Sequence, residues 1–258
     1  MPTATLLEKV YGSFSSEILE PVFSTLCKAL KVKLRVVGET NRGWVQIEVS
    51  GEDEVAALHF LDREVGLAPV SLRNIGKFSV VGGRVVFSGK DETGLYVDIG
   101  VYSPETKDAF IPVQRLQIQL ADGKKVPLRR LVEVFCLQNN LPLDVKLVQD
   151  VDAQKSWVVA ELSEAQLYQI VSWVRFSFDR LIVLGAFFPD VERAVKLSKH
   201  FRDVIRIESL GTLEQVILCK LGTDAVGLIS NLGRFLPDAT LVPFSPRKIQ
   251  QLIGKPFL

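Results

Sequence analysis

The segment from 82 to 116 constrains the fold most, because it packs short β-rich runs between glycines and a proline. Three such runs are expected at 84–88, 94–101 and 109–116. Four residues punctuate them, namely Gly89, Gly94, Gly100 and Pro104. Glycine and proline at such close intervals suit tight turns and sharply bent strands. We therefore predict a small, tightly curved antiparallel barrel in the middle of the chain.

Two motifs in this segment carry a resemblance to a known repeat. GLYVDIG at 94–100 and AFIPVQRL at 109–116 resemble the second and third strands of the RNA-binding OB repeat of the S-one ribosomal protein class. With 150–161 as the last hairpin, the resemblance covers roughly 77–162. It implies an OB-fold barrel with a face for single-stranded nucleic acid. The whole chain also resembles an uncharacterised archaeal family known only as a domain of unknown function, which implies no activity.

The aromatic positions of the OB repeat are only partly kept. In that repeat, aromatic residues flank the strand-two glycine and a histidine commonly follows on strand three. Tyr96 keeps one aromatic position here, whereas Thr93 and Pro112 occupy the other two. Stacking contributes about 1–3 kcal/mol per base. We expect Tyr96 to stack on a base and other contacts to supply most of the affinity, with a barrel kept as a scaffold or protein-docking surface as the alternative.

Basic side chains around the predicted barrel are candidate phosphate contacts. The segment 124–140 shows helical spacing of apolar residues, and its basic residues gather where that helix would start. Cations at a helix N-terminus oppose the macrodipole by roughly a few tenths of a kcal/mol, so such a placement favours a phosphate role. An ordinary solvated helix face is the alternative. The candidate contacts are Lys90, Arg115, Lys124, Lys125, Arg129, Arg130 and Lys155.

Periodicity predicts the order β-α-β-β-α in the first third of the chain. Strands are expected at 3–11, 33–37 and 44–49. A first helix starts at Ser15-Ser16-Glu17, where a serine hydroxyl is available for N-capping, and 52–65 shows the apolar spacing of a second. With 70–72 as a closing strand, this order matches the ferredoxin-like plan.

The same plan recurs near the C-terminus. Strands are expected at 180–186, 204–210, 213–221 and 240–244, with helices at 189–201 and 224–236. A connecting helix is expected at 163–178. The predicted fold class is therefore α+β. It comprises a ferredoxin-like domain at 1–74, an OB-fold barrel with an inserted helix at 75–162, and a connecting helix with a second ferredoxin-like domain at 163–258.

A second basic face is expected on the first helix of the C-terminal domain. Arg193, Lys196 and His200 recur at steps of three and four and share one face, with Lys199 and Arg202 beside it. Such a stripe suits the tracking of a nucleic-acid backbone, although solvated surface is the simpler alternative. The residues are Arg193, Lys196, Lys199 and Arg202.

Composition excludes several classes of function. The net charge of +1 argues against a protein that coats nucleic acid by bulk electrostatics. The longest apolar run, 181–188, is far shorter than the ~20 residues of a membrane span. Cys27, Cys136 and Cys219 lack metal-ligand spacing, so we expect buried thiols in a reducing cytoplasm and no metal or cofactor. His59 and His200 have no catalytic motif around them, so we expect no enzyme.

Together these features predict a cytoplasmic RNA-binding protein, associated with the ribosome or translation, that contacts structured RNA or a ribonucleoprotein through the OB barrel. The alternative is a protein-interaction factor of the transcription or translation machinery. That alternative rests on layout, because a ferredoxin-like domain joined to an OB barrel is similar to the stalk subunit of archaeal RNA polymerase.

Overall fold

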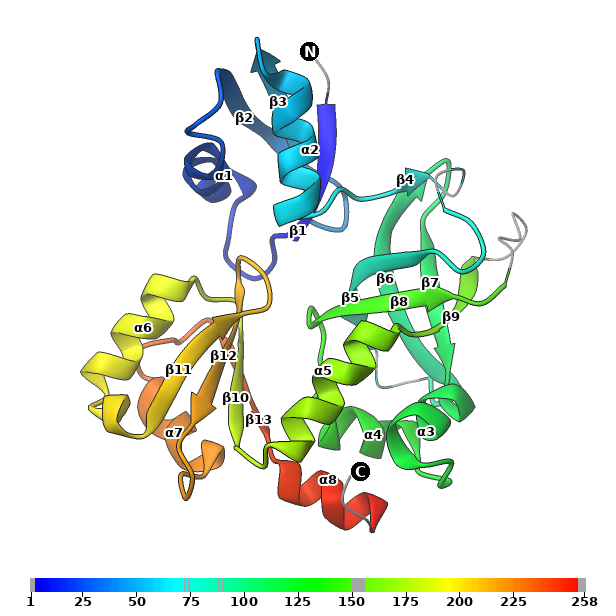
Figure 1. Ribbon diagram of the computed structural model, residues 1–258, viewed down its shortest axis with the longest axis vertical. Helices are drawn as coiled ribbons and strands as arrows, with labels where there is room; N and C mark the ends of the chain where they lie inside the picture. The colour runs from blue at the N-terminus through cyan, green and yellow to red at the C-terminus, as the bar shows by residue number, and fades with distance from the viewer. Residues whose placement is uncertain are drawn as a thin grey trace. The chain divides into compact units, whose positions relative to one another are not determined.

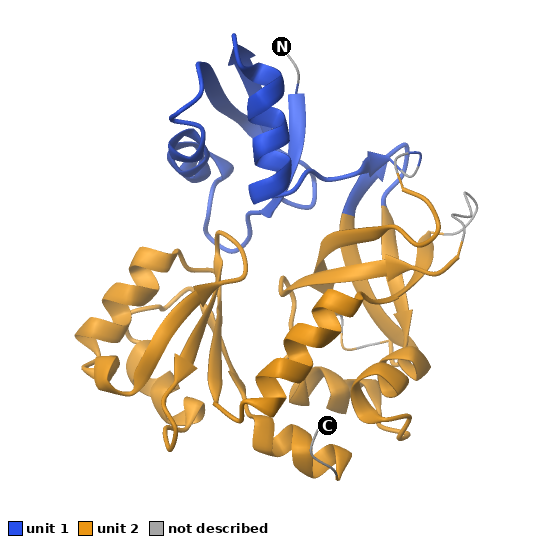
Figure 2. Ribbon diagram, in the orientation of Figure 1, with its two compact units in different colours: residues 1–74, 100–106 blue, residues 75–99, 107–258 orange. Residues whose placement is uncertain are grey.

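A computed structural model describes residues 3–71, 73, 75–87, 89, 91–149 and 156–254. The chain divides into two compact units, shown in blue and orange in Figure 2. Unit 1 comprises 1–74 and 100–106, and unit 2 comprises 75–99 and 107–258. Strand β6 (Gly94–Ser103) contributes to both units. The predicted α+β class is confirmed, with a closed barrel that lies, in chain order, between two sheets with helices.

Unit 1 contains a three-stranded antiparallel sheet in the order β1-β3-β2. The strands are β1 (Thr3–Lys9), β2 (Val32–Glu39) and β3 (Trp44–Gly51). The helices are η1 (Ser16–Leu19), α1 (Glu20–Leu26) and α2 (Glu54–Glu64). As expected, Ser15 is the first N-cap, and its hydroxyl accepts a hydrogen bond from the backbone N–H of Glu17. Phe23, Ile47 and Leu61 are fully buried in this unit.

The closing strand of the first ferredoxin-like plan is shortened and shifted. Residues 66–68 lie beside β1, where Leu6 and Leu67 form an antiparallel bridge and the Ala68 N–H donates to the Thr5 carbonyl at 2.8 Å. Pro69 has no N–H, so the ladder cannot continue through it. The prediction of a closing strand at 70–72 is therefore wrong. Instead, β4 (Val70–Ser71) pairs in parallel with the end of β6.

Unit 2 begins with the five-stranded barrel. Its strands are β5 (Val80–Val86), β6, β7 (Lys107–Pro112), β8 (Pro142–Leu147) and β9 (Trp157–Leu162). They follow the order β6-β5-β8-β9-β7, and an additional β6–β7 pairing closes the ring. The β7–β9 pair is parallel, and helices lie between β7 and β8 along the chain. This strand order is that of an OB-like barrel, as the sequence predicts.

Two element boundaries in the barrel differ from the sequence prediction. The expected third strand ends at Pro112, because helix α3 (Val113–Ala121) starts there and buries Leu116 and Leu120 at helical spacing. The basic helix expected at 124–140 is only the seven-residue α4 (Leu128–Val134), with Pro127 as its N-cap. Lys124 and Lys125 therefore precede the helix. The last hairpin is formed by β8 and β9, and its expected start at 150–155 lies outside the described residues.

The C-terminal part of unit 2 confirms the ferredoxin-like plan in full (Figure 1). Its antiparallel sheet has the order β11-β12-β10-β13. Leu181, Val183 and Ile217 of this sheet form a core with helix residues such as Val191 and Leu228. The elements are β10 (Arg180–Leu184), α6 (Phe188–Leu197), η3 (His200–Arg202), β11 (Val204–Ser209), β12 (Glu214–Cys219), α7 (Ala225–Leu232) and β13 (Thr240–Phe244).

Contacts inside unit 2 join the barrel to the C-terminal part. The connecting helix α5 (Glu164–Arg175) is capped by Ser163, whose Oγ accepts from the Gln166 N–H at 3.1 Å. Arg84 of β5 forms a buried ion pair with Glu214 of β12, with 3.4 Å between Nη2 and Oε2. Helix α8 (Pro246–Ile253), which periodicity did not predict, packs against α5.

Candidate nucleic-acid interface

Three aromatic rings lie next to one another on the outside of the barrel. Their residues are Tyr96 on β6, Phe110 on β7 and Trp157 on β9, here called the aromatic platform. The ring centroids are 4.9 Å apart for Tyr96 and Phe110, and 5.0 Å apart for Phe110 and Trp157. The interplanar angles are 43° and 47°, so the rings are tilted rather than parallel. Strands β6 and β7, which are consecutive in the chain, and the later strand β9 thus build one aromatic surface.

The period of a strand explains why these rings face outward. On β6, Leu95 and Val97 are fully buried on either side of Tyr96, and successive side chains in a strand point to opposite faces. On β9, Val158 is buried in the barrel core, so the preceding Trp157 lies on the outer face. Tyr96 and Trp157 are half-buried, and Phe110 is 9% exposed between them. Phe110 therefore forms the floor of the platform, and the other two rings keep accessible surface.

Gly94 makes room for the Phe110 ring. A Cβ atom at position 94 would lie only 2.5 Å from a ring carbon of Phe110 and would also meet the carbonyl oxygen of Ile111. Real Cβ atoms do not approach other heavy atoms so closely, so any other residue would displace the ring or the strand. Glycine at this position is thus required by close approach, which is one of its characteristic uses in strands.

Carboxylates border the platform. Oδ1 of Asp91 accepts from the N–H and the hydroxyl of Thr93 at 2.8 and 2.6 Å, and Oδ2 accepts from the Tyr96 hydroxyl at 3.2 Å. The Thr93 hydrogen bonds, with a smaller contribution from Tyr96, lower the pKa of Asp91. Burial, followed by Asp91 and Asp108, raises the pKa of Tyr96. Asp91 therefore stays ionised, and its hydrogen bond fixes the orientation of the Tyr96 ring.

The predicted phosphate contacts of the barrel have different surroundings. Arg115 of α3 pairs with Glu161 of β9 at 2.7 Å. Arg130 pairs with Glu133 at 2.8 Å. The Lys124 ammonium donates to the carbonyl oxygens of Leu252 and Ile253 at the end of α8. Two more candidates, Lys125 and Arg129, are exposed, and the last two, Lys90 and Lys155, lie outside the described residues.

The predicted second basic face on α6 is matched by carboxylates and an aromatic ring. Arg193 pairs with Asp190, and Lys196 pairs with Glu192 at 3.1 Å. Arg202 lies over the Phe201 ring at 5.6 Å, and Lys199 adopts a left-handed backbone at the start of η3. Arg193 and Lys196 are therefore each paired with a carboxylate about one helical turn away on α6.

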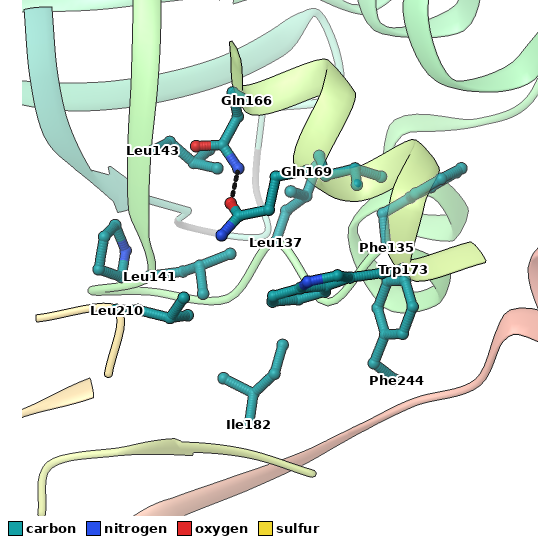
Figure 3. Close-up of a pocket in the computed structure, with 12 residues that line it drawn as sticks. Phe135, Leu137, Leu141, Leu143, Gln166, Gln169, Trp173, Ile182, Leu210 and Phe244 are labelled. Carbon is teal, nitrogen blue, oxygen red and sulfur yellow. Dashed lines mark hydrogen bonds between the residues drawn. The ribbon is translucent and has the colours of Figure 1, made fainter. Parts of the chain in front are cut away.

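A pocket inside unit 2 is too small to be a ligand site. It lies between α5, the loop before β8 and the β-sheet of the C-terminal part, as Figure 3 shows. The Trp173 and Phe244 rings meet edge to face at 5.4 Å, and the Gln166 and Gln169 amides are hydrogen-bonded at 3.0 Å. Its cavity volume of about 20 Å³ accommodates roughly one water molecule.

The buried thiols of unit 2 are poor candidates for a second site. Burial raises the pKa of both Cys136 and Cys219 to about 12, so these thiols are protonated and unreactive at neutral pH. Within the described ranges, no group of three or more His, Cys, Asp and Glu residues could hold a metal ion. Across the same residues, every helix is too short or too polar to cross a membrane.

Comparison with known proteins identifies the family. By its fold, the chain is a three-part α+β protein whose middle part is a closed five-stranded barrel. The models of the DUF2110 N-terminal, central and C-terminal domains match residues 3–69, 83–174 and 178–243. The chain therefore belongs to the DUF2110 family, which confirms the uncharacterised family recognised in the sequence.

Other comparisons add little. A protein of vaccinia virus (Wisconsin strain), known from its crystal structure, is 21% identical over an alignment that covers 34% of this chain and 87% of that protein, with a TM-score of 0.22. The comparison with curated proteins finds no match.

Sequence reasoning missed two of the three platform rings. Phe110 lies inside the AFIPVQRL motif, and the alternation of WVVAEL at 157–162 would have placed Trp157 on the outer face of the last strand. The sequence prediction gave the barrel one stacking residue, Tyr96, because it considered only the positions that are aromatic in the OB repeat. The platform instead uses neighbouring positions on the third and fifth strands of the barrel.

Proposed function

We propose that this protein binds single-stranded RNA by stacking bases on the aromatic platform, and that its role is binding rather than catalysis. The observation that carries the proposal is the adjacency of Tyr96, Phe110 and Trp157 on one outer face of the barrel. Base stacking on such rings is worth about 1–3 kcal/mol per base. Unpaired bases are the natural ligand, because bases in a duplex are already stacked and shielded.

Phosphate contacts in this proposal are few. Arg115 of α3 is paired with Glu161, which projects from the same face of β9 as Trp157. Lys125, between α3 and α4, and Arg129, in the first turn of α4, are exposed. Since most of the affinity then comes from stacking, we expect only a shallow dependence of binding on salt.

The cellular context is also part of the proposal. We infer a reducing cytoplasm, because the three cysteines are free and buried. Within it, single-stranded segments of ribosomal RNA or messenger RNA are the ligands that this mode of binding suits, which gives the protein a ribosome- or translation-associated role.

The test is a titration of a labelled single-stranded oligoribonucleotide followed by fluorescence anisotropy. Tyr96→Ala and Trp157→Ala are each expected to weaken binding by about 5- to 150-fold, the equivalent of one lost stacking interaction. The matched control is Tyr168→Ala on α5, because Tyr168 is 77% exposed and lies outside the platform. Unchanged affinity in both platform variants would contradict the proposal.

A second candidate function is docking of a protein partner on the barrel. It is favoured by the carboxylate of Asp91, which accepts from the Tyr96 hydroxyl, by Asp108, which is opposite Trp157 in the β7–β9 ladder, and by the ion pair that engages Arg115. A polyanion gains little from such a rim, whereas a cationic protein segment would be attracted. Co-purification after nuclease treatment separates the two functions, since a partner retained without nucleic acid, and lost in Trp157→Ala, supports docking.

A further inference from the structure

We propose that Phe78 and Lys77, in the turn before β5, are a second contact site for the RNA strand that the aromatic platform binds. The Phe78 ring stacks on a further unpaired base, and the Lys77 ammonium group contacts a phosphate. This inference rests on the proposed function, because it concerns how far the same strand is bound along the barrel. Phe78 is 62% exposed, although phenylalanine is among the residues most often buried.

Phe78 occupies a turn position that normally belongs to glycine or asparagine. The Ser79 N–H donates to the Gly76 carbonyl oxygen at 3.1 Å, which makes Lys77 and Phe78 the central residues of a β-turn. Phe78 has a φ of 69°, in the left-handed region that a bulky side chain rarely adopts. Because the ring is largely exposed, core packing does not offset this strain. Strained backbone clusters at functional sites, which favours a ligand-binding role for the ring.

The strained turn is fixed to the barrel by backbone hydrogen bonds. The Phe78 N–H donates to the Leu147 carbonyl oxygen at 2.8 Å, and the Leu147 N–H donates to the Ser79 carbonyl oxygen at 3.0 Å. Phe78 and Ser79 therefore oppose a single residue of β8, as in a β-bulge whose first residue is left-handed. Bulges of this kind redirect a side chain. The exposed position of the ring is thus set by the barrel itself.

Lys77 supplies a cation next to the exposed ring. Its Nζ lies 5.0 Å from the centroid of the Phe78 ring. Within the part of the chain that the structure describes, this ammonium group has no carboxylate partner, whereas Arg115 and Arg130 are ion-paired. Single-stranded nucleic acid offers bases that stack and phosphates that attract cations. An exposed ring beside an accessible cation matches both.

The turn lies within reach of a strand that starts on the platform. Leu147 of β8 is opposite Ala160 of β9, and Trp157 precedes Ala160 by three residues. Two strand spacings and three residues of β9 therefore separate Phe78 from Trp157, or roughly 14 Å along the barrel surface. At the spacing of about 3.4 Å per nucleotide in a stacked strand, roughly four nucleotides cover this distance. An octanucleotide can thus occupy both places, whereas a trinucleotide occupies the platform alone.

The experiment compares a labelled trinucleotide and octanucleotide of uridine by fluorescence anisotropy with the full chain. Phe78→Gly should weaken octanucleotide binding about 5- to 150-fold, the equivalent of one stacking interaction, and leave trinucleotide binding unchanged. Its urea midpoint should equal or exceed that of the unsubstituted protein, because glycine adopts a positive φ without strain. Phe78→Tyr keeps the ring and should keep the affinity. Lys77→Ala should reduce the salt slope of octanucleotide binding by about one.

The matched control is Phe201→Ala on η3. Phe201 is also an exposed phenylalanine, at 56%, and Arg202 lies over its ring at 5.6 Å. It belongs to the C-terminal part of unit 2 rather than to the barrel. This variant should bind both oligonucleotides as the unsubstituted protein does.

Each outcome separates the inference from the proposed function. Selective loss of octanucleotide binding in Phe78→Gly, with Phe78→Tyr and Phe201→Ala unaffected, supports the inference. Unchanged octanucleotide affinity in Phe78→Gly, while Trp157→Ala weakens binding, overturns the inference and leaves the proposed function standing. Equal losses for both lengths in Phe78→Gly also overturn the inference, because the platform itself would then be disturbed. Absence of binding to either oligonucleotide overturns the proposed function and the inference with it.

Discussion

The outer face of the barrel and helix α6 both carry side chains that the sequence marks as nucleic-acid contacts, but their surroundings differ. On α6, Arg193 and Lys196 are paired with Asp190 and Glu192, which lie one turn away on the same helix. The rings of the aromatic platform come from β6, β7 and β9, so they meet only when these strands close the barrel. A charge stripe on a helix is explained by its own neighbours, whereas the aromatic surface on the strand faces is the feature on which the proposed RNA binding rests.

The largest expected effect concerns the ion pair that joins the barrel to the C-terminal part. Replacing Arg84 with Met leaves Glu214 buried without this cation, and removing one partner of a buried pair typically costs about 3–5 kcal/mol. Urea unfolding measures the loss. The double variant Arg84→Met/Glu214→Leu should recover most of it, since apolar replacement of a buried pair is often neutral. A single-variant loss below about 1 kcal/mol would show that the pair does not hold the two regions together.

Glycine substitutions offer a matched comparison of the two regions. Gly94→Ala on β6 collides with Phe110 and should destabilise the protein by about 1–3 kcal/mol and weaken RNA binding. Gly227→Ala on the exposed face of α7 meets open space and should stabilise it by roughly 0.5–1 kcal/mol. Thermal unfolding and anisotropy measure both. Equal effects of the two substitutions would contradict the close approach at Gly94.

Alkaline pH tests whether both regions bury their thiols equally. Burial raises the pKa of Cys136, which follows α4, and of Cys219 on β12 from 9.0 to about 12. Both thiols stay protonated in the folded state and ionise in the unfolded state above pH 9, so their stabilising contribution is complete below that pH and falls as pH rises towards 12. The loss is roughly 1 kcal/mol per thiol for each pH unit. Urea unfolding at several alkaline pH values should show a shallower decline in Cys136→Ala, and an unchanged slope would contradict its burial.

The smallest expected effects come from charge removal on each region. Lys125→Ala/Arg129→Ala beside the barrel should weaken RNA binding a few-fold and reduce the salt slope by up to about 2, roughly one for each phosphate contact. Arg193→Ala/Lys196→Ala on α6 should change affinity by less than about twofold and stability by at most roughly 0.5 kcal/mol. Anisotropy titrations across salt concentrations measure both. A larger loss in the α6 variant would reverse the assignment of the binding face.

The C-terminal part was predictable because its signals agree with one another. Its strands are apolar runs, Asp224 caps α7 as an N-cap should, and the hairpin between β11 and β12 turns at Gly211 and Thr212. The start of α3 was missed because the β-favouring residues of AFIPV continue past Pro112, where the helix begins. Pro69 shortened the closing strand of the first domain in a similar way.

The candidate site was only partly predictable from sequence for a different reason. Tyr96 was found because it lies inside a strand motif, but its neighbours on the platform come from strands that join it only in the closed barrel. Lys124 shows the converse. Its ammonium group donates to carbonyl oxygens of α8, more than a hundred residues further along the chain. No local sequence pattern predicts that contact. Contacts between distant parts of the chain therefore decide which side chains form the aromatic platform and which cations already have a hydrogen-bond partner within the protein.

Ultraviolet crosslinking of a bound single-stranded RNA, followed by mass spectrometry of the crosslinked peptides, tests the central claim most directly. If bases stack on the aromatic platform, the crosslinked nucleotides will map to peptides that contain Tyr96, Phe110 or Trp157 and will disappear in Trp157→Ala. Crosslinks that map instead to residues 189–202 of the C-terminal part, and persist in that variant, would contradict the account.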